Sequence, residues 1–152
     1  MKKIIYALVI FVSTFGQAIS QSKNSQKSQL QKLNNYTFEL SEKVIRQKVT
    51  FKNRYGIILS GDLYAPKNSE NKKLSALAVS GPFGAVKEQS SGLYANQMAE
   101  RGFIVIAFDP SFTGESGGET RNIGSPDINT EDFSAAVDFL GLQKNVDRNK
   151  IG

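Results

Sequence analysis

The pattern of apolar and polar positions becomes that of a folded domain at about residue 44. Residues 48–52 alternate polar and apolar side chains, as a half-buried β-strand does. A turn at residues 53–56 leads into a second apolar run at residues 57–64. Two such runs joined by a short turn containing glycine predict an antiparallel hairpin.

Two further runs, residues 74–80 and 103–108, are apolar without alternation. This pattern is typical of strands covered on both faces. Between them, Ser90 or Ser91 is suited to cap a helix over residues 92–101. The apolar face of that helix is predicted to hold Tyr94, Ala95, Met98 and Ala99.

A long loop over residues 111–129 precedes a second predicted helix. Thr130 is suited to cap it, and acids in its first turn complement the positive helix end. Gly141 ends it, and residues 146–152 resemble a turn that leads into another strand. Its buried stripe is predicted to be Phe133, Ala136, Val137 and Leu140.

The order of these elements is hairpin, strand, helix, strand, helix and the beginning of a strand. Alternating buried strands and helices predict a doubly wound α/β sheet. Because the last strand has barely begun at Gly152, the second helix would lack a covering strand. We therefore expect the chain to be part of a larger sheet.

The first twenty residues have the organisation of a signal peptide. Lys2 and Lys3 precede an apolar run over residues 4–15, and residues 18–20 follow the small-x-small cleavage pattern. A membrane anchor is the alternative, but the run is shorter than the roughly 20 residues that span a bilayer. We expect residues 1–20 to be a cleaved signal and the protein to be periplasmic or secreted, with membrane contact only through that signal. The domains expected after it are a flexible leader, 21–43, and a partial α/β domain, 44–152.

Composition restricts the chemistry more than it identifies it. The 152 residues are 39% hydrophobic, which suits one globular domain, and they include no cysteine and no histidine. A thiol nucleophile, a histidine base and a cysteine metal site are therefore excluded within this sequence. Carboxylates are only scattered, so neither a metal nor a cofactor is expected. The net charge of +5 is not clustered, and no nucleic-acid partner is expected.

Residues 114–118, GESGG, match the G-x-S-x-G pattern of a nucleophile elbow. An elbow needs a strand that runs directly into the turn and a helix that leaves it. Here five residues separate Gly114 from the preceding strand, and no histidine is present to activate Ser116. We interpret the segment as a glycine-rich loop and Ser116 as a decoy, not a catalytic residue.

The segment Gly81-Pro82-Phe83-Gly84 directly follows a buried strand. Backbone N–H groups at such a position can point at a developing oxyanion, at the carboxyl ends of parallel strands. The alternative is an ordinary strand-to-helix connection. Asp109, at the end of the next strand, either lines the same site or starts an Asp-Pro turn.

Several segments together carry a resemblance to a known family. They are SGPFGAVKEQ (80–89), AERGF (99–103), AFD (107–109), GESGG (114–118) and DFxxAVDFL (132–140). Over about residues 44–152, the chain resembles the N-terminal half of an α/β-hydrolase, with dienelactone-hydrolase-like and Xaa-Pro dipeptidyl-peptidase-like bacterial enzymes as the nearest kin.

The resemblance implies that GESGG is the loop after the fourth strand and that the loop after the third strand supplies the oxyanion hole. Phe83 and Gly84 are then the candidate oxyanion donors, and the nucleophile, acid and histidine would lie beyond Gly152. The expected function is that of the N-terminal part of an exported hydrolase of small-molecule esters, thioesters or amides, inactive as this chain alone. The alternative is a small exported binding or assembly module that pairs its open sheet edge with a partner, for example by self-association.

Overall fold

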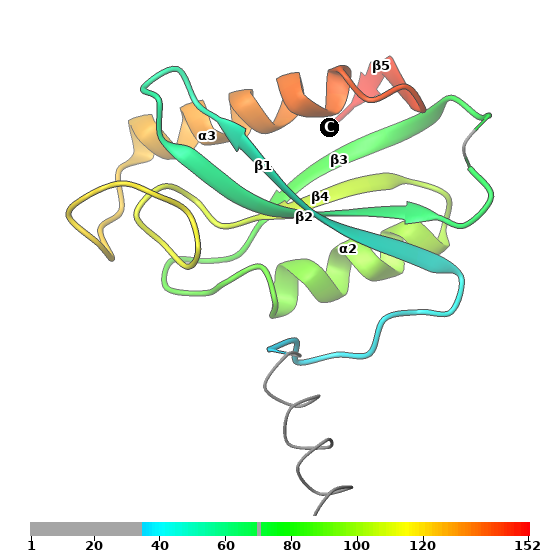
Figure 1. The fold of residues 1–152 in the computed structure, drawn as a ribbon, viewed down its shortest axis with the longest axis horizontal. Helices are drawn as coiled ribbons and strands as arrows, with labels where there is room; N and C mark the ends of the chain where they lie inside the picture. The colour runs from blue at the N-terminus through cyan, green and yellow to red at the C-terminus, as the bar shows by residue number, and fades with distance from the viewer. Residues whose placement is uncertain (1–34, 70) are drawn as a thin grey trace, which may run out of the picture. The chain divides into compact units, whose positions relative to one another are not determined.

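The computed structural model describes residues 35–69 and 71–152 (Figure 1). The predicted signal peptide, and the predicted leader up to residue 34, lie outside these residues. Within them the chain forms a mixed sheet and two helices. The elements are β1 (Val44–Lys52), β2 (Ile58–Pro66), β3 (Leu74–Ser80), α2 (Ser90–Glu100), β4 (Ile104–Phe108), α3 (Pro126–Gly141) and β5 (Val146–Ile151).

The sheet has the strand order β1-β2-β4-β3-β5. β1 pairs with β2 and β2 with β4 in antiparallel orientation, whereas β3 is parallel to both β4 and β5. The predicted hairpin and the α/β class are therefore confirmed. The last strand begins at Val146, which pairs with Leu74, and so the residues where the sequence predicted a turn already belong to the strand.

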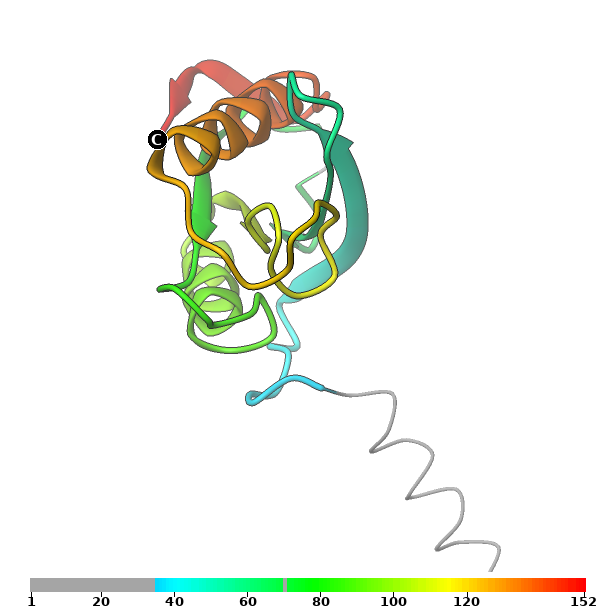
Figure 2. The same cartoon turned by 90° about the vertical axis from the view of Figure 1, so that its left-hand side faces the viewer.

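The sheet is the middle layer, with α2 on one face and α3 on the other (Figures 1 and 2). Alternate residues of β4 supply the two cores: Ile104, Ile106 and Phe108 pack on the α3 side. Val105 and Ala107 pack on the α2 side. All five are at most 1% exposed, which explains why this strand is a continuous apolar run.

Pairing of β3 with β4 brings the loops that follow them together. Ser80, the last residue of β3, is opposite Phe108, the last residue of β4. Both loops, residues 81–89 and 109–125, lie at the left-hand end of Figure 1 and face the viewer in Figure 2. This edge of the sheet is where open α/β sheets place their sites.

The N-terminal residues of the described chain contact β2, the loop after β3 and α2. The Tyr36 hydroxyl donates to Asp62 Oδ2 at 2.6 Å, and the Thr37 N–H donates to the Glu88 carbonyl at 3.0 Å. A Cβ on Gly92 would come within 3.0 Å of the Phe38 ring, so this ring rests directly on the helix. Residues 36–43, the end of the predicted leader, thus lie against the domain.

The buried face of α2 differs in part from the prediction. Ala95 and Ala99 are fully buried as expected, but Tyr94 is 50% exposed. Asn96 is buried instead, because its side chain accepts from the Ser41 N–H and donates to the Glu39 carbonyl. Hydrogen bonds to the N-terminal segment thus replace apolar contact at this position.

α3 begins four residues before the predicted cap at Thr130. Ser125 is the N-cap residue and accepts from the Ile128 N–H, and Pro126 is the first helical residue. Proline is favoured there because its fixed φ suits the helix and its missing N–H has no intrahelical partner to lose. Thr130 lies inside the helix, where its hydroxyl donates to the Pro126 carbonyl at 2.8 Å.

The predicted stripe of α3 is correct for Ala136 and Leu140 and wrong for Phe133 and Val137. The first two are fully buried, whereas the other two are 39% and 38% exposed. Asp132 is buried in their place, because its carboxylate is hydrogen-bonded to the loop after β4. In the part of the chain that the structure describes, no helix is long and apolar enough to cross a bilayer.

Candidate functional site

The loop after β3 presents two free backbone amides. Ala85 donates its N–H to the Pro82 carbonyl at 3.0 Å, and Gly84 has φ +83°, so residues 82–85 form a tight turn. Among residues 35–69 and 71–152, the N–H groups of Phe83 and Gly84 donate to no protein acceptor. The two predicted oxyanion donors are therefore available to a ligand oxygen.

A small hollow of about 60 Å³ lies beside these amides. The Phe83 ring is 75% exposed at its rim, and Ile123 is 42% exposed. A Cβ on Gly124 would come within 3.3 Å of the Phe83 ring, so this glycine lets the ring lie against the 120s loop. The lining residues are Gly81, Pro82, Phe83, Gly84, Ala85, Pro110, Thr113, Ile123, Gly124 and Asn129.

Near the end of the same loop, Lys87 is buried among three carboxylates. Its side chain is fully buried, and its Nζ lies 2.7 Å from Glu88 Oε1, 3.0 Å from Asp109 Oδ2 and 2.7 Å from Glu115 Oε2. The Lys87 backbone N–H also donates to Asp109 Oδ1 at 2.7 Å. We call Lys87, Glu88, Asp109 and Glu115 the Lys87 cluster.

The charges of this cluster support one another. Burial alone would lower the pKa of Lys87, but hydrogen bonds to Glu115, Glu88 and Asp109 outweigh it and raise that pKa above its ordinary value. Hydrogen bonds from Lys48 and Lys87 lower the pKa of Glu115 to about 2. Lys87 and Glu115 are therefore both charged at neutral pH.

Asp109, for which the sequence left two roles open, connects three segments of chain. Besides Lys87, its Oδ2 accepts from the Glu115 N–H at 3.0 Å. Gly114 has φ +54°, and a Cβ there would lie 2.3 Å from the same oxygen. The carboxylate therefore fills the space that a side chain at position 114 would occupy. It lies behind the loop and does not line the hollow.

The Ser116 hydroxyl has two backbone partners. It donates to the Asp109 carbonyl at 2.6 Å and accepts from the Ser60 N–H at 2.8 Å. The residue is 2% exposed, so a substrate carbonyl has no access to it in this conformation. Lys87 is far from Ser116 in sequence, but its Nζ donates to Glu115, the residue next to Ser116. Lys87 forms no hydrogen bond with the Ser116 hydroxyl, whose partners are the Asp109 carbonyl and the Ser60 N–H.

A second buried polar cluster connects α3 to the loop after β4. Asp132 accepts from the Ser111 N–H at 2.7 Å, the Ser111 hydroxyl at 2.8 Å and the Asn53 amide at 2.8 Å. Asn53 Oδ1 in turn accepts from the Tyr55 and Ile57 N–H groups, each at 3.0 Å. This cluster holds the β1–β2 turn, α3 and residue 111 together.

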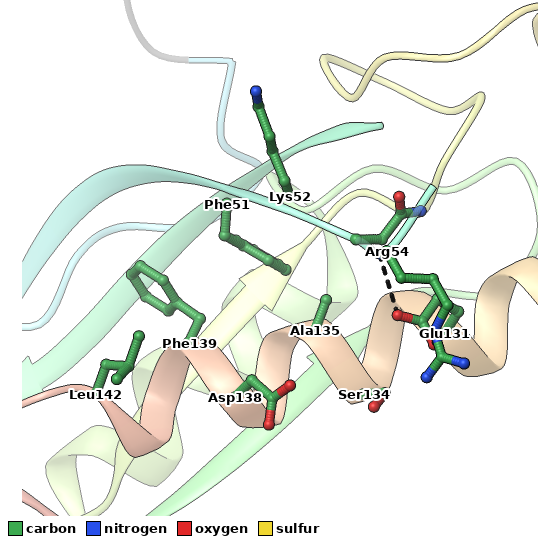
Figure 3. A pocket seen from close by; sticks show the side chains of 10 residues that line it. Phe51, Lys52, Arg54, Glu131, Ser134, Ala135, Asp138, Phe139 and Leu142 are labelled. Atoms are coloured by element: carbon green, nitrogen blue, oxygen red, sulfur yellow. Dashed lines mark hydrogen bonds and ion pairs between the residues drawn. The ribbon is translucent and has the colours of Figure 1, made fainter. Parts of the chain in front are cut away.

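A larger groove, of about 440 Å³, lies between the end of β1 and α3 (Figure 3). The Phe51 and Phe139 rings stack in it with centroids 5.3 Å apart. Two of its charged side chains form an ion pair, with Arg54 Nε 2.7 Å from Glu131 Oε2. Within the described residues, no group of three or more acidic side chains is arranged to hold a metal ion, in this groove or elsewhere.

Sequence reasoning thus located the free amides but missed Lys87. A lysine next to a glutamate carries no local signal of burial, because most lysines are exposed. The available signal was topological: residues that follow two neighbouring parallel strands meet at one sheet edge, and Lys87 and Asp109 are such residues.

Comparison with known proteins agrees with the α/β fold described above. Over 116 residues, which are 76% of this chain and 31% of the relative, the chain is 67% identical to the uncharacterized protein PA2218 of Pseudomonas aeruginosa. The crystal structure of that protein superposes with a TM-score of 0.75 at 66% identity, over 78% of this chain and 37% of the other. Alpha/beta hydrolase GrgF from Penicillium superposes with a TM-score of 0.64 at 26% identity, over 70% of this chain and 36% of the other. The chain has the fold of the N-terminal part of an α/β-hydrolase.

Two further relatives extend the comparison of this α/β-hydrolase fold. The uncharacterized protein YcjY of Escherichia coli is 45% identical over 112 residues, 72% of this chain and 37% of the relative. Thiohydrolase aneE of Aspergillus aculeatus is 33% identical over 112 residues, 74% of this chain and 34% of the relative. The chain spans about a third of the length of the curated relatives it matches. No protein-family model matches it, and the dienelactone-hydrolase-like subfamily stays a prediction.

Proposed function

We propose that this chain supplies the oxyanion-binding part of an α/β-hydrolase that cleaves small-molecule esters or thioesters. The observation that carries the proposal is the pair of free N–H groups, Phe83 and Gly84, at the carboxyl end of a parallel strand. An apolar rim beside them, Phe83 and Ile123, offers contact to an acyl or leaving group.

The proposed chemistry is acyl transfer. A nucleophile attacks the carbonyl carbon, the C=O π electrons move to the oxygen, and the N–H groups stabilise the resulting oxyanion. Collapse of this intermediate re-forms the carbonyl, leaves the acyl group on the nucleophile and releases the alcohol or thiol, which takes up the proton that the nucleophile lost. Water then attacks the acyl group through a second oxyanion and releases the carboxylic acid and the nucleophile. Donors about 2.7–3.1 Å from the oxyanion contribute most because their dipoles are already oriented before the reaction.

The nucleophile of this reaction is not assigned to any residue of the chain. Cysteine and histidine do not occur in its 152 residues, and the Ser116 hydroxyl is bonded to backbone on both sides. The proposal places the nucleophile, acid and histidine in sequence beyond Gly152, as the family resemblance implies. Ser116 as a decoy is part of the same proposal.

The names of the relatives favour a thioester over an amide. Proteins named thiohydrolase are 33% and 31% identical to this chain over about a third of their length. Specificity in such sites depends on residues around the acyl group, most of which would belong to the rest of the protein. Amide hydrolysis stays the less favoured form of the proposal.

The free edge of β5 supports the alternative function, a binding or assembly module. Among the described strands, β5 has a neighbour on one side only, and an unpaired edge favours association. We would measure light scattering on the purified chain. A discrete dimer would support that alternative, whereas a monomer or an aggregate would not.

The test of the hydrolase proposal begins with the source DNA past codon 152. We expect the frame to continue through an apolar strand into a G-x-[SC]-x-G turn and a later histidine. The protein expressed from that whole frame should then hydrolyse p-nitrophenyl esters or acyl thioesters and react with a fluorophosphonate probe. Labelling of Ser116 by the probe, or a stop codon at 153, would contradict the proposal. Export is proposed with it, and the mature N-terminus near Gln21 is checked by Edman sequencing.

A further inference from the structure

Lys87 lies in a position where a charged side chain requires an explanation. It is 1% exposed, although lysine is almost never fully buried without partners. Burial of an ion pair is weak evidence of stabilisation, because desolvation of the charges offsets their attraction. In some proteins, buried charges instead hold the chain in one conformation, and the contacts of Lys87 fit this role.

The loop that presents the free amides is held at its beginning to the last residue of β4 and at its end to the residue that follows β4. At its beginning, Ser80 pairs with Phe108. At its end, the Lys87 N–H donates to Asp109 Oδ1 at 2.7 Å, and Lys87 Nζ reaches Asp109 Oδ2 at 3.0 Å. Residues 81–86 therefore span two adjacent fixed points, Phe108 and Asp109, and have little freedom to shift.

A second contact fixes the loop against the segment opposite. Lys87 Nζ bonds Glu115 Oε2 at 2.7 Å, and Glu115 is itself held by the Ser60 hydroxyl at 3.1 Å and by Lys48. Residues 81–85 line the hollow, and so do Pro110 and Thr113 from the segment that leads to Glu115. The Lys87–Glu115 ion pair therefore connects two of the segments that form this hollow.

We propose that Lys87 is a positioning residue, which aims the free amides of Phe83 and Gly84 by fixing the end of their loop to Asp109 and to Glu115. This inference rests on the proposed function for its catalytic consequence, but not for its structural one. Lys87 does not touch the oxyanion position. It acts through the backbone that it anchors.

The experiment uses the full-length protein that contains this chain, with two variants. Lys87→Met keeps an aliphatic side chain and removes the three ion pairs of Lys87, with Glu88, Asp109 and Glu115. Glu115→Gln removes the charge of Glu115, and with it the ion pairs to Lys87 and Lys48, but keeps the contacts between Lys87 and Asp109. Because Glu115 is 48% exposed, this variant is expected to fold. Asp132→Asn is the matched control. Asp132 is as deeply buried as Lys87 and is hydrogen-bonded to the loop after β4, but its hydrogen bonds are not to residues 81–87.

The first readout is hydrogen exchange, by mass spectrometry, of the peptide covering residues 81–89. Its protected amides include Ala85, Lys87 and Gln89. We expect these amides to exchange at least about tenfold faster in Lys87→Met and detectably faster in Glu115→Gln, because local opening becomes easier. Asp132→Asn should leave this peptide unchanged. Equal exchange rates of this peptide in the parent and in all three variants would overturn the positioning role.

The second readout is the split between kcat and KM on the ester substrate. We expect Lys87→Met to lower kcat by up to about 10²-fold, the cost of misplacing a catalytic group by about 1 Å, with KM changed much less. A loss of kcat in Asp132→Asn of the same size would show a general effect of destabilisation and would overturn the inference. If the full-length parent hydrolyses nothing, the proposed function fails, and the exchange experiment still decides the role of Lys87. Should Lys87→Met not fold, Glu115→Gln decides both readouts.

Discussion

Phe83 contributes two separable groups to the candidate site. Its backbone N–H is free and its ring is 75% exposed at the rim of the hollow. The two can be removed one at a time, because alanine keeps the N–H and loses the ring, whereas proline loses both.

In the full-length protein, Phe83→Pro should lower kcat for ester hydrolysis by about 10²–10³-fold, the usual effect of losing one oxyanion donor. Phe83→Ala should keep kcat within a few fold and raise KM, because only apolar contact is lost. Steady-state kinetics on both variants check this. Similar losses of kcat in the two variants would exclude the Phe83 N–H as an oxyanion donor.

At the scale of elements, α3 is held in place by polar contacts as well as by its buried apolar residues. Asp132 accepts three hydrogen bonds from Ser111 and Asn53 and is fully buried on the helix. These contacts connect α3 to the loop after β4 and to the β1–β2 turn.

Asp132→Ala should therefore destabilise the fold by about 3 kcal/mol, because it leaves several buried donors without an acceptor. Asp138→Ala, on the exposed side of the same helix, should change stability by no more than about 0.5 kcal/mol. Urea unfolding followed by circular dichroism measures both. A loss for Asp132→Ala as small as that of the control would show that the cluster adds little to stability.

The elements that the sequence predicts well are those defined by local pattern. The continuous apolar runs of β3 and β4 and the β1–β2 hairpin have the expected class and pairing. The start of α3 and the faces of both helices depend on distant partners, such as Ser111 for Asp132 and Ser41 for Asn96. A residue that is buried because of a hydrogen bond to another part of the chain has no periodic signal to reveal it.

The candidate site divides in the same way. The segment 81–84 could be found because glycine and proline directly after a buried strand mark an exposed backbone turn. The choice of Phe83 and Gly84 as oxyanion donors came from the family resemblance and stays a prediction. The Lys87 cluster could not be found, because its members come from two loops and meet only through the order of the strands. The 36–43 segment was assigned to the leader because it precedes the first periodic pattern, and its contacts with the domain are to residues distant in sequence, such as Asp62 and Asn96.

At the scale of the whole molecule, the charges at the sheet edge make stability depend on pH. The pKa of Glu115 is lowered to about 2 from 4.5, so the folded state favours the carboxylate. Its contribution is therefore fully present above about pH 4.5 and is lost as the pH falls toward 2. Solvent screening limits the size of the effect, since the side chain is about half exposed.

Thermal melts between pH 2 and pH 7 should show this dependence in a comparison of the parent with Glu115→Gln. We expect the parent to have the higher Tm at pH 7 and the two to converge as the pH approaches 2, where the parent carboxyl is protonated. A difference in Tm that is the same across the range would show that the ionised form of Glu115 is not the stabilising one.

The contact between Asp109 and Gly114 has a consequence for how this protein can change over generations. The Asp109 carboxylate occupies the volume of a missing Cβ at position 114, and the backbone there has positive φ. Position 114 therefore cannot accept a side chain while Asp109 stays as it is, and a change at 114 requires a change at 109. Gly56, also at positive φ but with open space around it, carries only the backbone constraint. Inherited variation should thus be tolerated at position 56 well before it is tolerated at positions 109 and 114, which are expected to change together.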